Sequence, residues 1–175
     1  MTSGSDRASN LVLAGFMGVG KSTVGRIVAA RLRLVFVDTD AEIERRAGRT
    51  IAQIFAQDGE TAFRRLEAQV CQEVAAGRDQ VIAVGGGALL DESTRRAFAQ
   101  TGLIVCLTAS LDAILARVGD DPARPLFSAD RARLAALYAA RAAHYAALPH
   151  TVDTTARTPA EVAGEVIRLW TQQPN

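Results

Sequence analysis

The chain has 175 residues and a formal net charge of +1, and hydrophobic residues make up 49% of it. This length and composition fit one globular domain with a sizeable core, and they exclude an intrinsically disordered chain. A near-neutral charge argues against a general nucleic-acid binder, because such proteins hold the phosphate backbone with surplus basic residues. No apolar run approaches the ~20 residues of a membrane-spanning helix, so we expect no membrane span.

The two cysteines, Cys71 and Cys106, form no metal-binding spacing. Cys106 lies in the apolar run 103–107, where a free cysteine packs as a small hydrophobic residue. A disulfide framework is not expected, which favours a reducing compartment and hence the cytoplasm. Residues 1–10 are small and polar and lack an apolar secretory core. We therefore expect an N-terminal tail over residues 1–10 and a single domain over residues 11–172.

The first predicted strand, over residues 11–14, runs into the glycine-rich segment GFMGVGKST at residues 15–23, and a helical apolar pattern follows. This segment contains the P-loop pattern G-x-x-x-x-G-K-[ST], whose glycines admit phosphate groups close to backbone N–H groups. Its lysine can reach the β- and γ-phosphates, and its serine hydroxyl is the expected Mg²⁺ ligand. The alternative is a chance glycine-rich turn that caps a helix. The expected nucleotide contacts in this segment are Gly18, Val19, Gly20, Lys21, Ser22 and Thr23.

A second apolar run, over residues 34–38, is typical of a parallel strand buried on both faces, and it ends in Asp38-Thr39-Asp40. Residues two apart in an extended chain point to the same side, so both carboxylates can face the P-loop. One carboxylate can then support a Mg²⁺ shell, and the other can accept a hydrogen bond and a proton from a hydroxyl group. The alternative is that Asp40 merely caps the helix that begins at Ala41.

A long helix is predicted over residues 59–76, and it carries Arg64. A guanidinium at this position can clamp an anionic or polyhydroxy substrate. The alternative is a surface ion pair with Glu60 or Glu67, which lie four residues before and three residues after Arg64 on the same helix face. Both interpretations hold together if the ion pair is buried, because it would then orient the arginine.

Three consecutive glycines, Gly85, Gly86 and Gly87, follow a third predicted strand over residues 80–84. Glycines weaken a strand end, and their use is the close approach of a ligand to bare N–H groups. Ligands of parallel α/β sheets gather beyond the carboxyl ends of the strands. The glycines therefore predict substrate contact, and the alternative is an ordinary flexible turn.

The stretch 119–130 breaks the periodicity of the chain with one Gly, two Pro and three Asp. A segment of this length in a small domain is often a lid, and Arg124 within it can reach a transferring phosphoryl group on closure. Solvation by water is the alternative for this arginine, as for any other. His144 and His150 show no partner in the sequence pattern, and we expect them to be structural or exposed.

The remaining helices are predicted over residues 41–47, 50–55, 91–100, 111–118 and 131–148, and from the capping box Thr158-Pro159-Ala160-Glu161 onward. The remaining strands are predicted over residues 103–107 and 151–153. Strands that alternate with helices predict a single α/β domain with a mainly parallel sheet. The motifs described above fall at the carboxyl ends of its strands or in the segments that follow them.

Together these motifs resemble the shikimate kinase family, the small ATP-dependent kinases of the aromatic amino-acid pathway, over about residues 11–170. The residues that carry the resemblance are GFMGVGKST from Gly15, Asp-Thr-Asp from Asp38, Asp-Gly-Glu-x-x-Phe-Arg-x-x-Glu from Asp58, the glycines from Gly85, Arg124-Pro125-Leu126 and Arg141-x-x-x-Tyr145. The resemblance implies a P-loop, nucleoside-monophosphate-kinase-like three-layer α/β sandwich. Its five-stranded parallel sheet would have the order 2-3-1-4-5, and a lid would lie at about residues 119–130.

The resemblance also implies transfer of the γ-phosphate of ATP to the 3-hydroxyl of shikimate, which gives 3-phosphoshikimate and ADP. The implied shikimate contacts are Asp40, Arg64, Gly85, Gly86, Gly87 and Arg141, with the two arginines on the carboxylate and Asp40 on the ring hydroxyls as the candidate base. Asp38 would join Ser22 at Mg²⁺, and Arg124 would close over ATP, with Arg117 and Arg157 near the adenine. The expected catalytic residues are Lys21, Asp40 and Arg124.

One departure from the family pattern lies late in the chain. The family usually has Arg-x-Pro-Leu-Tyr, whereas this chain has Arg141-Ala142-Ala143-His144-Tyr145. A missing proline can shift where the helix bends and so where Arg141 lies. Two alternative functions remain, a kinase for another small polyhydroxy acid such as gluconate and a nucleotide-binding regulatory protein without catalysis. We expect a monomer, because no exposed apolar stripe is evident.

Overall fold

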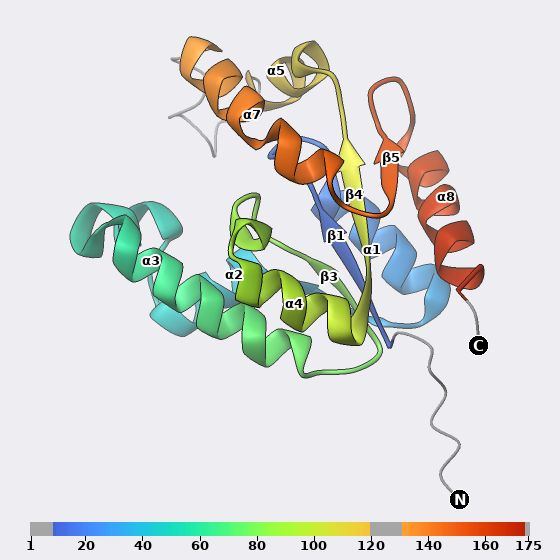
Figure 1. Ribbon diagram of the computed structural model, residues 1–175, viewed down its shortest axis with the longest axis horizontal. Coiled ribbons are helices and arrows are strands. Elements are labelled where there is room, and N and C mark those ends of the chain that lie inside the picture. The colour runs from blue at the N-terminus through green and yellow to red at the C-terminus, as the bar shows by residue number, and fades with distance from the viewer. Residues whose placement is uncertain (1–8, 120–130, 174–175) are drawn as a thin grey trace, which may run out of the picture.

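The computed structural model describes residues 9–119 and 131–173 and contains one five-stranded parallel sheet in the order β2-β3-β1-β4-β5 (Figure 1). The strands are β1 (Asn10–Ala14), β2 (Val35–Asp38), β3 (Gln80–Ala83), β4 (Gly102–Thr108) and β5 (Thr151–Asp153). The helices are α1 (Lys21–Leu32), α2 (Thr39–Ala47), α3 (Ile51–Ala75), the 3₁₀ helix η1 (Ala88–Leu90), α4 (Glu92–Thr101), α5 (Leu111–Gly119), α7 (Arg131–Ala146) and α8 (Pro159–Thr171). The α/β class and the strand order expected from the sequence are confirmed.

The central strand β1 is buried on both faces, which explains its uninterrupted apolar sequence. Leu11 and Leu13 belong to the core on one side of the sheet, which α1, α5, α7 and α8 complete. Val12 and Ala14 belong to the core on the other side, beneath α2, α3 and α4. The sheet is thus the middle layer of three, and its strands end at the edge over which α5 and α7 lie (Figure 1).

The first strand begins one residue earlier than the sequence predicted, because Asn10 is fully buried in β1 and is not part of a tail. Its side-chain amide donates to the Gly77 carbonyl at 2.7 Å and accepts from the Gln80 amide at 3.2 Å. These hydrogen bonds replace the water that a buried amide loses. Residues 1–8 lie outside the described residues.

Helix α3 begins at a capping box in which Thr50 and Gln53 exchange hydrogen bonds between their side chains and backbone amides. The sequence predicted two helices here, and the structure has one element interrupted at Gly59, whose φ of 81° and ψ of 171° are not helical. The capping box predicted at Thr158 and Glu161 is confirmed at the start of α8.

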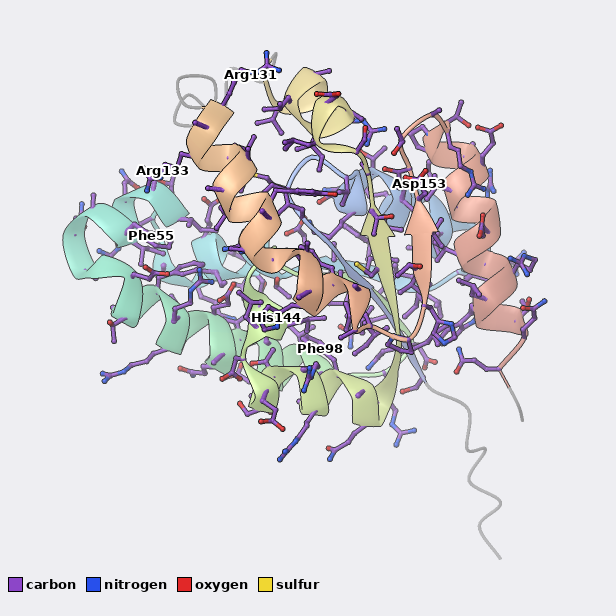
Figure 2. All side chains as sticks on the ribbon, turned by 45° about the horizontal axis from the view of Figure 1, so that its top comes forward. Phe55, Phe98, Arg131, Arg133, His144 and Asp153 are labelled. Atoms are coloured by element: carbon purple, nitrogen blue, oxygen red, sulfur yellow. The ribbon has the colours of Figure 1, made fainter. Side chains whose placement is uncertain are left out.

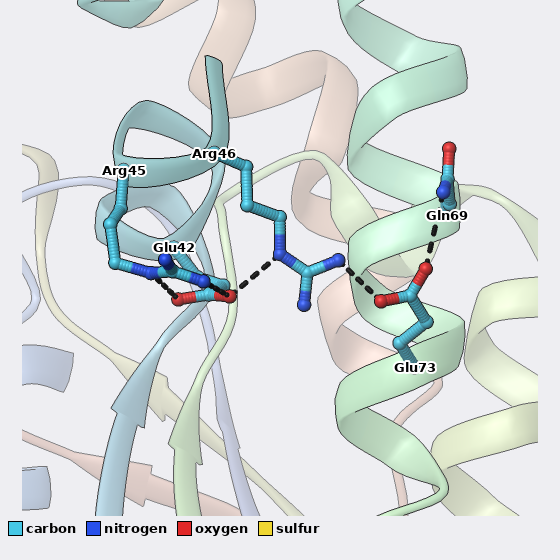
Figure 3. Close-up of polar contacts among 5 residues, drawn as sticks. All are labelled: Glu42, Arg45, Arg46, Gln69 and Glu73. Atoms are coloured by element: carbon cyan, nitrogen blue, oxygen red, sulfur yellow. Dashed lines mark hydrogen bonds and ion pairs between the residues drawn. The ribbon is translucent and has the colours of Figure 1, made fainter. Parts of the chain in front are cut away.

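Helix α2 is tied to the second half of α3 by a chain of charged groups (Figure 3). Glu42 accepts from Arg45 at 2.7 Å and from Arg46 at 2.6 Å, and Arg46 also pairs with Glu73 on α3. Gln69 donates to the same Glu73 carboxylate at 3.1 Å. Hydrogen bonds from the two arginines, and then their charges, lower the pKa of Glu42 to about 2.

Within residues 9–119 and 131–173, no helix is both long enough and apolar enough to cross a membrane.

Candidate active site

The P-loop lies between the end of β1 and the start of α1, as the sequence predicted. Gly20 precedes the helix with φ of 96°, a left-handed conformation that is costly for residues with a Cβ. This turn directs the first backbone N–H groups of α1 into the loop. A helix N-terminus presented in this way is an anion-binding element.

Lys21 is the single lysine of the chain and the first residue of α1. Its Nζ donates to the carbonyl oxygens of Gly15 and Phe16, each at 2.9 Å. The ammonium group is therefore held over the loop by backbone acceptors of the loop itself.

Asp38 joins the P-loop to the start of α2. Its Oδ2 accepts a hydrogen bond from the Ser22 hydroxyl at 2.7 Å, and its Oδ1 accepts from the amides of Asp40 and Ala41 at 3.1 and 3.3 Å. The capping role that the sequence left open for Asp40 belongs to Asp38, and the helix begins at Thr39. The Asp40 side chain is therefore not the cap of α2.

The three consecutive glycines, hereafter the glycine turn (Gly85–Gly87), are the point on which side chains from three helices converge. A methyl group added at Gly85 would lie 2.6 Å from Oδ1 of Asp40, on α2. One at Gly87 would lie 2.7 Å from Nη1 of Arg64 on α3, and one at Gly86 would lie 3.4 Å from Nη1 of Arg141 on α7. The same methyl at Gly86 would lie 3.8 Å from the Met17 amide of the P-loop. Glycine is needed here because charged groups and a second loop approach the backbone closely.

Arg64 is held by two carboxylates of its own helix. Its Nη1 donates to Glu67 at 2.7 Å, and its Nη2 donates to the more distant Glu60 at 3.4 Å. Partial burial lowers the pKa of Arg64, but the hydrogen bond and charge of Glu67, together with Glu60, outweigh burial and raise it. The ion pairs of Arg64 with Glu60 and Glu67, which the sequence offered as an alternative, are thus present. The same arginine also approaches the glycine turn at Gly87.

Arg64 and Arg141 face a cleft of about 550 Å³ between α3, the glycine turn, the start of α4 and α7. Glu67, Asp91 and His144 also line it. Pockets of this size accommodate small molecules. Among the described residues, no group of three histidine, cysteine or acidic side chains is arranged to hold a metal ion.

The other residues predicted to bind the nucleotide are Arg117, Arg157 and Arg124, and they belong to separate segments of the chain. Arg117 donates to the Gly18 carbonyl of the P-loop at 3.3 Å and to the Thr154 carbonyl at 2.6 Å, so it connects the P-loop with the segment after β5. Arg157 forms an ion pair with Glu165 on α8. Arg124 and the predicted lid lie outside the described residues, apart from Gly119 at the end of α5.

Three residues of the site were given no role there by the sequence analysis. The buried Thr39 hydroxyl accepts from the Gly85 amide at 3.1 Å, and the buried Tyr145 hydroxyl donates to the Gly86 carbonyl at 2.5 Å. His144 is exposed, as expected, but it lines the cleft on the side of α7 that faces α4 (Figure 2). The spacing of Tyr145 from Arg141, one helical turn, is the sequence signal that could have found the tyrosine.

The comparisons with known proteins agree with this geometry. The family model of shikimate kinase matches residues 17–171. A shikimate kinase of Thermobifida fusca (strain YX) is 49% identical over 154 residues, covering 87% of this chain and 89% of that protein. A solved shikimate kinase from Acinetobacter baumannii in complex with shikimate is similar with a TM-score of 0.86 and 34% identity, covering 94% of this chain and 93% of that chain.

A gluconokinase from Sinorhizobium meliloti 1021 is similar with a TM-score of 0.58 and 18% identity, covering 95% of this chain and 94% of that chain. At this identity the likeness reflects the fold alone, so the alternative of a gluconate kinase is not favoured. The family model spans most of the chain, and relatives at more than a third identity share its length. The chain therefore belongs to the shikimate kinase family of ATP-dependent kinases.

Proposed function

We propose that the protein transfers the γ-phosphate of ATP to the 3-hydroxyl of shikimate, which yields 3-phosphoshikimate and ADP for chorismate and aromatic amino-acid biosynthesis. The observation that carries this proposal is the convergence of Asp40, Arg64 and Arg141 on the glycine turn beside the P-loop. A ring acid with several hydroxyls needs cations for its carboxylate and a carboxylate for its hydroxyls, and this set supplies both.

On the acceptor side, Arg64 and Arg141 hold the shikimate carboxylate. A guanidinium can grip a carboxylate through two parallel hydrogen bonds, which fixes the orientation of the ring. The glycine turn (Gly85–Gly87) offers backbone groups to the ring without side chains in the way. Asp40 accepts a hydrogen bond from the reacting hydroxyl and orients it, and it takes the proton as the phosphoryl group transfers.

On the donor side, the P-loop amides from Gly18 to Thr23 surround the phosphates of ATP. Lys21 exchanges the carbonyl oxygens of Gly15 and Phe16 for β- and γ-phosphate oxygens, and this contact is stronger because both partners are charged. Arg117 and Arg157 lie toward the adenine. Arg124 stays a prediction of the sequence for the closed state, as the residue that balances charge on the transferring group with Lys21.

Ser22 and Asp38 fit a magnesium site. Their oxygens are 2.7 Å apart, and hydroxyl and carboxylate oxygens are the ligands that Mg²⁺ prefers. When bound, Mg²⁺ neutralises charge on the β- and γ-phosphate oxygens. Ser22 and Asp38 already face each other, so little reorganisation of the protein is required to receive the ion.

We also propose that the protein works as a cytoplasmic monomer. Both cysteines are buried and unpaired, which suits a reducing compartment. Sedimentation analysis with and without substrates tests the oligomeric state.

The test of the proposed activity is ADP release with ATP and Mg²⁺, measured with shikimate, with gluconate and with no acceptor. We expect ADP release that depends on shikimate, a phosphorylated shikimate detected by mass spectrometry, loss of activity with EDTA and recovery with Mg²⁺. Release with gluconate but not shikimate would identify the other polyhydroxy-acid kinase. Nucleotide binding without any acceptor-dependent release would identify a regulatory protein.

A further inference from the structure

Helix α7, which carries Arg141, packs against the core through Leu134 near its start, Leu137 and Tyr138 in its middle and Tyr145 near its end. It is rich in alanine, and the buried side chains among its residues are Leu134, near its start, and Tyr145, near its end. The helix runs without interruption through Ala142 and Ala143, where the family pattern has a proline. The position of Arg141 therefore depends on how the second half of α7 is held against the sheet.

Tyr145 is the attachment point one helical turn after Arg141. Its hydroxyl donates to the Gly86 carbonyl at 2.5 Å, and the residue is 8% exposed. Burial raises the pKa of Tyr145, and the nearby charge of Arg141 only partly opposes this, so the hydroxyl keeps its proton near neutral pH and remains a donor. The hydrogen bond joins α7 directly to the glycine turn.

The glycine turn separates the two arginines of the site. Arg141 approaches it at Gly86, and Arg64 approaches it at the next residue, Gly87. The carbonyl that Tyr145 binds belongs to the peptide group between these two glycines. A displacement of α7 relative to this peptide would therefore change the distance between the two guanidinium groups.

We propose that Tyr145 is a positioning residue, whose hydroxyl clamps α7 to the glycine turn and so sets the spacing of Arg141 and Arg64 for one carboxylate. This inference rests on the proposed function. It assigns the tyrosine no contact with substrate. The hydroxyl acts through Gly86 and through the position of Arg141 on α7.

The experiment compares Tyr145→Phe with Tyr138→Phe, and these residues are the two tyrosines of the chain. Tyr138 is a matched control, because it also lies on α7 and its hydroxyl also donates to a backbone carbonyl, that of Ala109, at 3.0 Å. Steady-state kinetics would give the KM for shikimate, the KM for ATP and the turnover for each variant. Circular dichroism would verify that both fold.

We expect Tyr145→Phe to raise the KM for shikimate by roughly 3- to 10-fold, the range for one lost hydrogen bond, with the KM for ATP and the saturated turnover nearly unchanged. Tyr138→Phe should leave the KM for shikimate unchanged. In an Arg141→Ala background, the effect of Tyr145→Phe should shrink, because the residue through which it acts is absent.

Three results would overturn the inference: an unchanged KM for shikimate in Tyr145→Phe, an equal rise in Tyr138→Phe, or full additivity with Arg141→Ala. In each of these outcomes the unmodified protein still phosphorylates shikimate. Failure of the proposed function would instead leave the unmodified protein without shikimate-dependent ADP release, so the two failures are distinguishable.

Discussion

Arg64 and Glu67 form a hydrogen bond of 2.7 Å in which the carboxylate is the buried partner, with 6% of its side chain exposed against 36% for the arginine. The buried carboxylate of Glu67 restrains Nη1 of the guanidinium, while Nη2 has only the longer contact of 3.4 Å with Glu60 at the cleft. The ion pair with Glu67 therefore orients the Arg64 guanidinium at the edge of the cleft.

Arg64→Lys should weaken shikimate binding by roughly 1.5–3 kcal/mol, the range for a hydrogen bond to a charged group, because lysine cannot copy the two parallel contacts. ATP binding without shikimate should stay nearly the same, since the P-loop is untouched. Separate calorimetric titrations of shikimate and ATP measure both. Arg65→Lys, at the exposed neighbouring position, is the control. Unchanged shikimate affinity in Arg64→Lys would reduce Arg64 to an ion-pair partner of Glu60 and Glu67.

Lys21→Ala should lower turnover on the order of 10²-fold or more, because it removes a charge that is most useful as negative charge develops on the transferring group. The folded variant should keep its melting temperature, since the lost hydrogen bonds to Gly15 and Phe16 lie within a loop. Single-turnover measurement of ADP formation checks the rate. Near-normal turnover in a folded variant would refute the assignment of the P-loop.

Gly87→Ala should impair shikimate binding more than stability. The new methyl group would lie 2.7 Å from Arg64 Nη1, and the end of a flexible side chain can move away. The displaced guanidinium should then raise the KM for shikimate several-fold. Gly164→Ala is the control, because a methyl group there meets no atom within 4 Å and alanine favours the helix by about 1 kcal/mol. Equal KM values in the two variants would contradict the close approach of Arg64.

Glu42→Gln should change how the free energy of unfolding depends on pH in the acidic range. The pKa of Glu42 is lowered from 4.5 to about 2, so its charged form stabilises the folded protein above pH 4.5, and this contribution is lost as the pH falls toward 2. Denaturant unfolding should show a difference between the unmodified protein and the variant near pH 6 that shrinks as the pH falls from 4.5 to 2. For a partly exposed pair the difference should be at most about 1 kcal/mol.

The control for this measurement is Glu92→Gln, a more exposed carboxylate that pairs with Arg96 within α4. Glu92→Gln should change the free energy of unfolding near pH 6 by less than Glu42→Gln does, because the Glu92–Arg96 pair does not join two helices. A difference for Glu42→Gln that stays constant down to pH 2 would contradict the role of the charged network.

The fold was readable from the sequence because its signals are local. The apolar run 103–107 becomes a buried strand, and the capping boxes at Thr50 and Thr158 mark helix starts. The run 34–38, expected to be buried on both faces, instead forms the edge strand β2, in which Val35 is 63% exposed, because β2 has a neighbouring strand on one side only. The boundary at Asn10 was missed, because a buried amide is satisfied by Gly77 and Gln80, which are remote in sequence. Local pattern carries no information on such partners.

Some residues of the candidate site could be predicted from local sequence patterns, and others could not. The P-loop is contiguous in the chain, so its pattern alone located Lys21 and Ser22. The glycine turn was recognised as a place for close approach, but which side chains approach it depends on how three helices pack. The spacing of Tyr145 from Arg141 points to the tyrosine, but its partner could not be predicted, because the hydrogen bond to Gly86 spans 59 positions of sequence.

The central position of β1 in the sheet affects how this protein folds while it is being synthesised on the ribosome. The strands that flank it are β3 and β4, so β1 has no neighbour in the sheet until residues 80–83 and then 102–108 have been made. Domains generally fold as units during synthesis, and pairing between distant strands is slow because long loops must close first. A nascent chain that ends before β4 thus contains every residue of the P-loop, but β1 has a neighbouring strand on one side only. ATP should therefore protect such truncated chains from proteolysis poorly, and protection should begin once the fourth strand has left the ribosome.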